Sequence, residues 1–179
     1  MEEVIRATEL GISLKGLVLP GGLRMAEGEV SLDAPILSVK PFSIPEGTIC
    51  HATLVFLDED VRAYLEEKQP ANLSDFRVKA EDGEITIVAV ARVLLPVEVG
   101  AVGLLEFADG KLNFVPRRIE AGGMNAESLA RPHLERVNPL VDLTGLPVRA
   151  DVQSLDIGSG AIRISVRLET TAAIPRLAP

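Results

Sequence analysis

The chain is poor in the residues that make rigid cores or reactive sites. Its 179 residues include no tryptophan, one tyrosine, five phenylalanines, two histidines and one cysteine. The single cysteine, Cys50, excludes an intramolecular disulfide. The hydrophobic share of 47% is therefore almost entirely aliphatic, and its β-branched part favours strands. Such a composition fits either an ordinary aliphatic core or an apolar interior cavity.

The chain also has no excess of basic residues. Its formal net charge is −8, and Arg117 and Arg118 are the only adjacent pair of basic residues. Nucleic-acid binding requires a basic surface that displaces counterions, so no nucleic-acid partner is predicted. Electrostatic attraction to an anionic membrane is disfavoured for the same reason, which leaves membrane contact open without favouring it.

Targeting and membrane-spanning patterns are missing as well. The first three residues are Met1, Glu2 and Glu3, with neither a basic n-region nor an apolar h-region after them. The longest uncharged apolar stretch, around residues 93–97, is too short to cross a bilayer. The sequence therefore predicts a cytoplasmic protein, or an envelope protein if a leader has been removed.

Motifs for catalysis or metal binding are few. Cys50 and His51 are neighbours on a predicted strand, so their side chains point to opposite faces and cannot form a dyad. His133 lies on a predicted helix, and no spacing of His, Cys, Asp and Glu matches a metal site. Gly21-Gly22 and Gly122-Gly123 match no phosphate-binding motif. We expect no enzyme activity and no cofactor.

Turn residues flanked by alternating aliphatic residues predict several β-hairpins. The predicted turns are Glu27-Gly28, Asp82-Gly83, Asp109-Gly110 and Ser159-Gly160. The alternation that includes Val148, Ala150 and Val152 shifts by one residue before Leu155 and Ile157. That shift predicts a β-bulge near Gln153.

Two helices are predicted, over residues 58–68 and 125–137. In the first, Asp58 caps the N-terminus, and Val61 with Leu65 forms an apolar stripe. Asn125 can cap the second, which Pro132 kinks or restarts. The apolar residues of the second helix are Leu129, Ala130, Leu134 and Val137.

Residues 58–93 and 125–168 share one order of elements. Each reads as a helix, an X-Pro stop, a Leu-Ser or Leu-Thr turn, and a hairpin. Such an order suggests two like halves, each covering the apolar face of the other. The chain is expected to form one domain over residues 1–170, with a C-terminal tail over 171–179.

Several short segments resemble one known family. They are residues 109–116, 119–124, 137–143 and 146–147, preceded by 69–70, 73–78 and 82–83. Together they resemble the lipomannan-elongation-factor-like phospholipid-binding family of bacteria, over about residues 48–168. The resemblance implies a tubular lipid-binding (TULIP-like) fold of the α+β class. In this fold a strongly curved antiparallel β-sheet wraps around one or two helices and leaves an elongated apolar groove.

The function implied is non-enzymatic binding of a phospholipid or another long apolar ligand between sheet and helix. Arg117 or Arg118 would meet a charged headgroup. The predicted lining residues are Val61, Leu65, Ile85, Ile87, Ala89, Leu129 and Leu134. Taken one by one, an ordinary core position is the simpler interpretation of each of these residues. The alternative is a structural or protein-interaction domain with a solid aliphatic core, which is either fully self-packed or dimerises through an edge strand.

Overall fold

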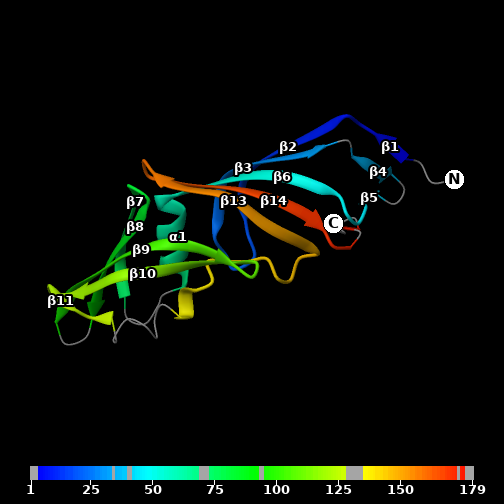
Figure 1. Cartoon of the computed structure of the whole chain (residues 1–179). Coiled ribbons are helices and arrows are strands. Elements are labelled where there is room, and N and C mark those ends of the chain that lie inside the picture. The colour runs from blue at the N-terminus through cyan, green and yellow to red at the C-terminus, as the bar shows by residue number, and fades with distance from the viewer. Residues whose placement is uncertain are drawn as a thin grey trace.

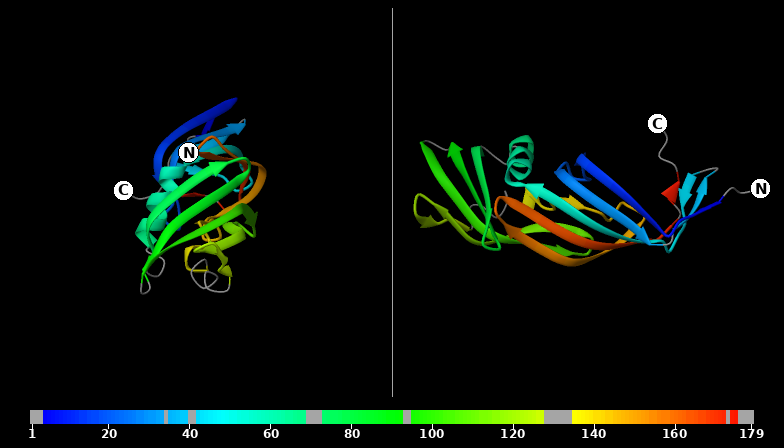
Figure 2. Two further views of the ribbon diagram at one scale, coloured as in Figure 1. Left: turned by 90° about the vertical axis from the view of Figure 1, so that its left-hand side faces the viewer. Right: turned by 90° about the horizontal axis from the view of Figure 1, so that it is seen from above.

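The chain folds into three antiparallel β-sheets and short helices, as the α+β prediction requires. The computed structural model describes residues 4–33, 35–39, 42–68, 73–92, 95–127, 135–172 and 174–175. The molecule is elongated, and both termini lie at one end beside a small four-stranded sheet (Figures 1 and 2). That sheet contains β1 (Val4–Arg6), β4 (Ile36–Val39), β5 (Phe42–Ile44) and β15 (Ile174–Pro175).

Two larger sheets form the body of the molecule. The five-stranded sheet has the order β13-β14-β6-β3-β2. Its strands are β2 (Glu9–Val18), β3 (Arg24–Asp33), β6 (Ile49–Leu57), β13 (Val148–Gly158) and β14 (Ala161–Thr170). The six-stranded sheet has the order β11-β10-β9-β8-β7, with β12 also paired to β10. Its strands are β7 (Leu73–Glu81), β8 (Glu84–Arg92), β9 (Pro96–Ala108), β10 (Lys111–Ala121), β11 (Met124–Asn125) and β12 (Val141–Asp142).

Three of the four predicted hairpin turns are confirmed. Asp82-Gly83, Asp109-Gly110 and Ser159-Gly160 each join two antiparallel strands, and all six residues have positive φ between 51° and 83°. Positive φ at both central positions is the type I′ turn, which glycine and short polar residues adopt most readily. The predicted bulge is confirmed too, since the β13–β14 register shifts at Gln153.

The predicted turn at Glu27-Gly28 is wrong. Residues 24–33 form the continuous strand β3, and the chain reverses earlier, at Pro20, Gly21 and Gly22. Gly28 serves packing instead, because a Cβ there would lie 2.6 Å from Cε of the fully buried Met25. A glycine required for space looks the same in a sequence as a glycine required for a turn.

The first predicted helix is confirmed as α1 (Asp58–Lys68). Its N-terminus is held differently from the prediction, since Asp58 Oδ1 accepts the Ala80 N–H of β7 at 2.9 Å. The buried Asp60 instead reaches back, and its Oδ2 accepts the Leu57 N–H at 3.0 Å. Asp60 Oδ1 also lies 3.3 Å from Arg24 Nη1 on β3. Both carboxylates thus fix the helix to neighbouring strands.

The second predicted helix lies mostly outside the described residues. Residues 128–134, including Leu129, Pro132, His133 and Leu134, belong to that part of the chain. Within the described residues, 135–137 are helical. The predicted tail is also partly described: Thr171 N donates to Pro147 O at 2.9 Å, and Ile174–Pro175 pair with β5.

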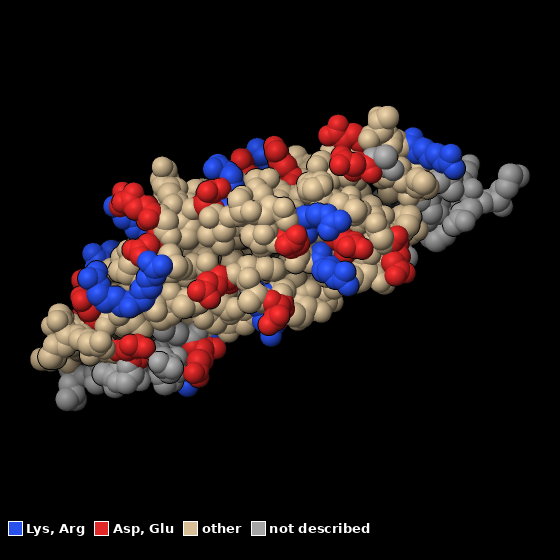
Figure 3. All heavy atoms as spheres, in the orientation of Figure 1, with Lys and Arg blue, Asp and Glu red and all other residues tan. Residues whose placement is uncertain are grey.

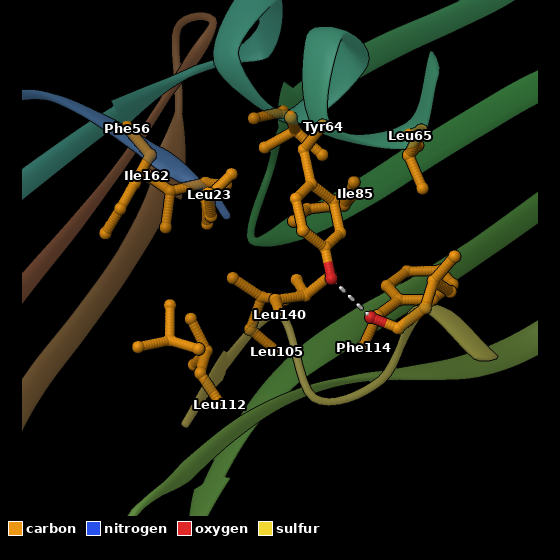
Figure 4. Close-up of a cluster of buried hydrophobic side chains, with 14 of the residues drawn as sticks. Leu23, Phe56, Tyr64, Leu65, Ile85, Leu105, Leu112, Phe114, Leu140 and Ile162 are labelled. Atoms are coloured by element: carbon orange, nitrogen blue, oxygen red, sulfur yellow. Dashed lines mark hydrogen bonds between the residues drawn. The ribbon is translucent and has the colours of Figure 1, made fainter. Parts of the chain in front are cut away.

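The core fills the space between α1 and the facing parts of the two large sheets (Figure 4). Leu23, Phe56 and Ile162 come from the five-stranded side, and Ile85, Leu105 and Phe114 come from the six-stranded side. Strand β8, which supplies Ile85, ends at Arg92, and β9 begins at Pro96.

Tyr64 connects α1 to the segment that precedes β12. Its hydroxyl donates to Val137 O at 2.9 Å inside the core (Figure 4). The next residue, Asn138, uses its side-chain amide to pair with both backbone groups of Phe114, at 2.9 and 2.8 Å. Polar contacts therefore hold the chain at Val137 and Asn138 between α1 on one side and β10 on the other.

We expect Tyr64→Phe to lower the free energy of unfolding by about 1–2 kcal/mol, because it leaves the buried Val137 carbonyl without its donor. Chemical denaturation of both proteins measures the difference. Glu67→Gln, an exposed change on the same helix, is the control and should be neutral. A Tyr64→Phe protein as stable as the wild type would contradict this role.

A second prediction concerns Asp58. Partial burial raises the pKa of its carboxyl, more than the hydrogen bond from Ala80 lowers it. The pKa of Asp58 is higher in the folded state than in the unfolded state. As pH rises through the folded-state pKa, ionisation of Asp58 therefore lowers the free energy of unfolding. Below the unfolded-state pKa, Asp58 is protonated in both states and this loss of stability is absent. Asp58→Asn keeps an acceptor and cannot ionise. Its gain in Tm over the wild type should be largest near pH 7 and shrink toward about pH 4. Thermal unfolding across this range tests it, and a pH-independent difference would refute it.

Candidate functional site

The five-stranded sheet has one apolar face. Cross-strand registers place aliphatic side chains of all five strands on it. We call this surface the apolar face; it comprises Leu10, Ile12, Leu14, Gly28, Val30, Leu32, Cys50, Ala52, Leu54, Phe56, Val148, Ala150, Val152, Leu155, Ile157, Ile162, Ile164, Val166 and Leu168. Strand alternation puts the intervening residues on the other face, which carries Lys15, Glu27, His51 and Arg163, among others.

The inner half of the apolar face is packed. Phe56, Ile162 and Ile164 belong to the core under α1, and Leu54 and Leu155 pack against that core. These residues lie toward the ends of the strands that meet the six-stranded sheet (Figure 1). This part of the face is therefore ordinary protein interior.

The outer half of the apolar face, toward the four-stranded sheet, is covered less. On the central strands, Leu32, Ala52 and Val166 are buried. On the edge strands, Val148 and Ala150 of β13 are half-buried, as is Leu10 of β2. Ile12 of β2 is 40% exposed, although it lies on the apolar face. The apolar face thus opens to solvent along both edges of the sheet. The residues of this outer half are Leu10, Ile12, Val30, Leu32, Cys50, Ala52, Val148, Ala150, Val166 and Leu168.

A cleft of about 640 Å³ opens along the β13 edge. Its apolar wall combines Val148, Ala150 and Val152 with Phe107 of β9 and Leu143. Val152 also packs against the core, so the cleft adjoins the protein interior. The polar residues of the cleft are Asp109, Thr144, Arg149, Asp151 and Thr171.

The polar residues of this cleft are of mixed sign. Arg149 Nη1 lies 4.0 Å from Glu169 Oε2, and two carboxylates, those of Asp109 and Asp151, are nearby. Acidic and basic side chains are likewise interspersed on the face of the molecule in Figure 3. A ligand of this cleft would be recognised by its apolar part more than by its charge.

A second cleft, of about 540 Å³, lies on the polar side of the same sheet. Asp33, Glu46, His51 and Arg167 line it, together with Ile36, Ile49 and the backbone around Gly47. Its charged groups are of mixed sign, and its lining contains both polar and apolar residues. It has less apolar wall than the β13 cleft.

The structure places four of the predicted lining residues in the core and a fifth against it. Val61 and Leu65 of α1 and Ile85 and Ala89 of β8 are at most 3% exposed and belong to one cluster, against which Ile87 packs. Neither of the two clefts described above includes any of them. Leu129 and Leu134 lie outside the described residues.

The outer half of the apolar face was missed by sequence reasoning. The signal is the alternation of Leu10, Ile12 and Leu14 on one strand and of Val148, Ala150 and Val152 on another. Alternation alone shows that a face is apolar. It does not show whether another element covers that face.

The other singled-out residues lie apart from the β13 cleft. Cys50 is buried on the apolar face, where desolvation raises the pKa of its thiol, and His51 is exposed on the opposite face. Arg117 Nη1 lies 3.2 Å from Glu84 Oε1, and Arg118 Nε lies 3.7 Å from Glu120 Oε1. These arginines thus have carboxylate partners of their own on the six-stranded sheet.

Two features are absent from the described ranges. No group of three or more His, Cys, Asp and Glu side chains is arranged to hold a metal ion in the part of the chain that the structure describes. Across the same residues, no helix has the length and apolar character needed to cross a membrane.

Comparison of the chain with protein-family models, with curated proteins and with solved structures gave no match.

The contrast between the packed core and the open β13 edge of the apolar face predicts unequal responses to one substitution. Ala89→Leu adds volume to a packed site and should cost about 1–3 kcal/mol of unfolding free energy. Ala150→Leu adds the same volume beside an open cleft and should change stability by less than about 0.5 kcal/mol. Chemical denaturation of the matched pair measures both. Equal costs would contradict the distinction between the packed core at Ala89 and the open cleft wall at Ala150.

Proposed function

We propose that the protein binds an acyl chain or a similarly long apolar molecule on the outer half of the apolar face, entering at the β13 cleft. The observation that carries the proposal is an apolar face that continues from the core to solvent at Val148, Ala150 and Val152. Exposed apolar surface of this kind commonly marks an interaction or ligand site.

The size of the cleft supports this class of ligand. Ligand sites typically have volumes of roughly 300–1,000 Å³ and mostly apolar walls. The β13 cleft, at about 640 Å³, falls within that range. Burial of ten methylene groups would supply up to about 8 kcal/mol before association costs. The chain of the ligand alone could therefore provide measurable affinity.

We further propose that the fold is TULIP-like, with two like halves. Supporting contacts join the turns of the β7–β8 and β13–β14 hairpins: Gly83 N donates to Ile157 O at 3.0 Å, and Gly160 N donates to Ala80 O at 3.0 Å. Gly160 follows Gly83 by 77 residues, and Ile157 follows Ala80 by the same interval. In each of the two bonds, the turn glycine of one hairpin donates to the carbonyl that lies three residues before the turn glycine of the other hairpin.

The bulges of the two hairpins support the same offset. The register of β7 with β8 shifts between Ser74 and Arg77, and that of β13 with β14 shifts between Val152 and Ser154. Arg77 and Ser154 are again 77 residues apart. Bulges bend a strand, so two hairpins bent at equivalent positions would curve alike around a shared interior. This arrangement supports the proposal of two like halves.

The first test is uptake of a fluorescent fatty acid by delipidated protein, with native mass spectrometry to count bound molecules. We expect Val148→Asp to weaken uptake at least about tenfold, because it places a charge on the apolar wall. Val55→Asp is the control, since Val55 lies on the opposite face of the same sheet and is also half-buried.

Circular-dichroism melts must show that both variants remain folded. Uptake by wild type and by Val55→Asp, with loss in Val148→Asp, supports the site. Wild-type protein that neither carries nor takes up an acyl chain would refute the proposal. Equal uptake by both variants would place binding elsewhere on the molecule.

A further inference from the structure

Strand β2 forms an open edge of the five-stranded sheet. It is ten residues long, and within the described residues it pairs only with β3. The β2–β3 pairing has no register shift from Glu9 to Val18. Gly16 has a positive φ of 66°, so residues 9–15 are the regularly extended part of this edge. A regular edge of this kind presents unpaired backbone donors and acceptors to another strand.

The other long edges carry features that discourage strand addition. Edge strand β13 has the bulge at Gln153 and three charged residues, Arg149, Asp151 and Asp156. Edge strand β7 has a bulge and four charged residues in nine positions. In contrast, β2 has two charged residues, Glu9 and Lys15, and exposes Ile12, Leu17 and Val18 by 40–59%. Bulges and charges are the usual protection of an edge, and β2 has little of either.

The sequence of β2 is complementary to itself in one antiparallel register. With Ile12 opposite Ile12 of a second copy, Leu10 lies opposite Leu14 and Gly11 opposite Ser13. In the same register Glu9 lies opposite Lys15, twice by symmetry. Leu10, Ile12 and Leu14 lie on the apolar face, whereas Glu9 and Lys15 lie on the opposite face. On one face of the joined sheet, apolar side chains therefore meet apolar side chains. On the other face, each Glu9 carboxylate meets a Lys15 ammonium group.

The charges around Glu9 favour that partner. Within one chain Glu9 lies directly opposite Asp33 on β3, and like charges in this position destabilise a sheet. Lys15 already has a carboxylate near it, since its Nζ is 3.6 Å from Glu27 Oε1. A second copy would place a Lys15 ammonium on the open side of Glu9. Two exposed ion pairs would then close the ends of the new strand pair.

We propose that two copies of this chain form a symmetric dimer by antiparallel pairing of their β2 strands, centred on Ile12. The interface is isologous, as a twofold axis requires. It joins two five-stranded sheets into one and makes their apolar faces continuous across Leu10, Ile12 and Leu14. The dimer contact is made by the β2 edge, whereas the acyl chain is proposed to enter at the β13 cleft on the far edge of the same sheet.

A charge-swap experiment tests this register with purified full-length protein. Glu9→Lys alone sets two ammonium groups opposite each other across the interface, and Lys15→Glu alone sets two carboxylates opposite each other. Each single variant should dimerise about tenfold more weakly than the wild type, because two attractive pairs become repulsive. An equimolar mixture of the two single variants should restore dimers, since both cross-strand pairs are then of opposite charge. Sedimentation-equilibrium analysis gives the dissociation constants.

Lys79→Glu on edge strand β7 is the control and should dimerise like the wild type. Both Glu9 and Lys15 are exposed, so the variants should keep the melting temperature of the wild type within a few degrees. A wild-type protein that stays monomeric at high micromolar concentration overturns the proposal. So does a dimer unaffected by the single variants, or a mixture of the two that fails to restore wild-type affinity.

Discussion

The structure depends on the coverage of one apolar sheet face. Because strand side chains alternate, the five-stranded sheet directs its aliphatic residues to one side, and that side must be kept from water. Helix α1 and the β9–β10 hairpin cover the inner half, where Phe56 and Ile162 are 1% exposed. No comparable element covers the edge-strand positions of the outer half within the described residues. The candidate site and the proposed dimer edge both arise from this incomplete coverage.

The contacts between the two large sheets determine where the covered part of the apolar face ends. The Asp58 carboxylate accepts the Ala80 N–H, and Asp58 N donates to Gly160 O at 3.1 Å. Asp60 joins the same helix start to Arg24 on β3. These bonds hold α1 and two hairpin turns together, so the sheets overlap only in the middle of an elongated molecule (Figure 2). Each sheet then extends beyond the overlap at its own end.

Local patterns in the sequence predicted local structure well. The Asp-Gly and Ser-Gly turns, helix α1 and the bulge at Gln153 each follow from a few neighbouring residues whose backbone or alternation requirements are specific. Gly28 misled because its reason is tertiary: it makes room for Met25. The candidate site could not be located for a similar reason. Ile85 and Val148 are both aliphatic residues of predicted strands, and tertiary packing makes the first a buried core residue and the second part of a cleft wall.

Photo-crosslinking would locate a bound acyl chain on the molecule without relying on any substitution. The probe is a fatty acid that carries a diazirine near the end of its chain, and the labelled peptides are mapped by mass spectrometry. We expect labels on the outer half of the apolar face, in β13 and β14 around Ala150 and Leu168, and competition by unlabelled fatty acid. Labels concentrated on the six-stranded sheet, or labels that unlabelled fatty acid does not displace, would contradict the proposed site.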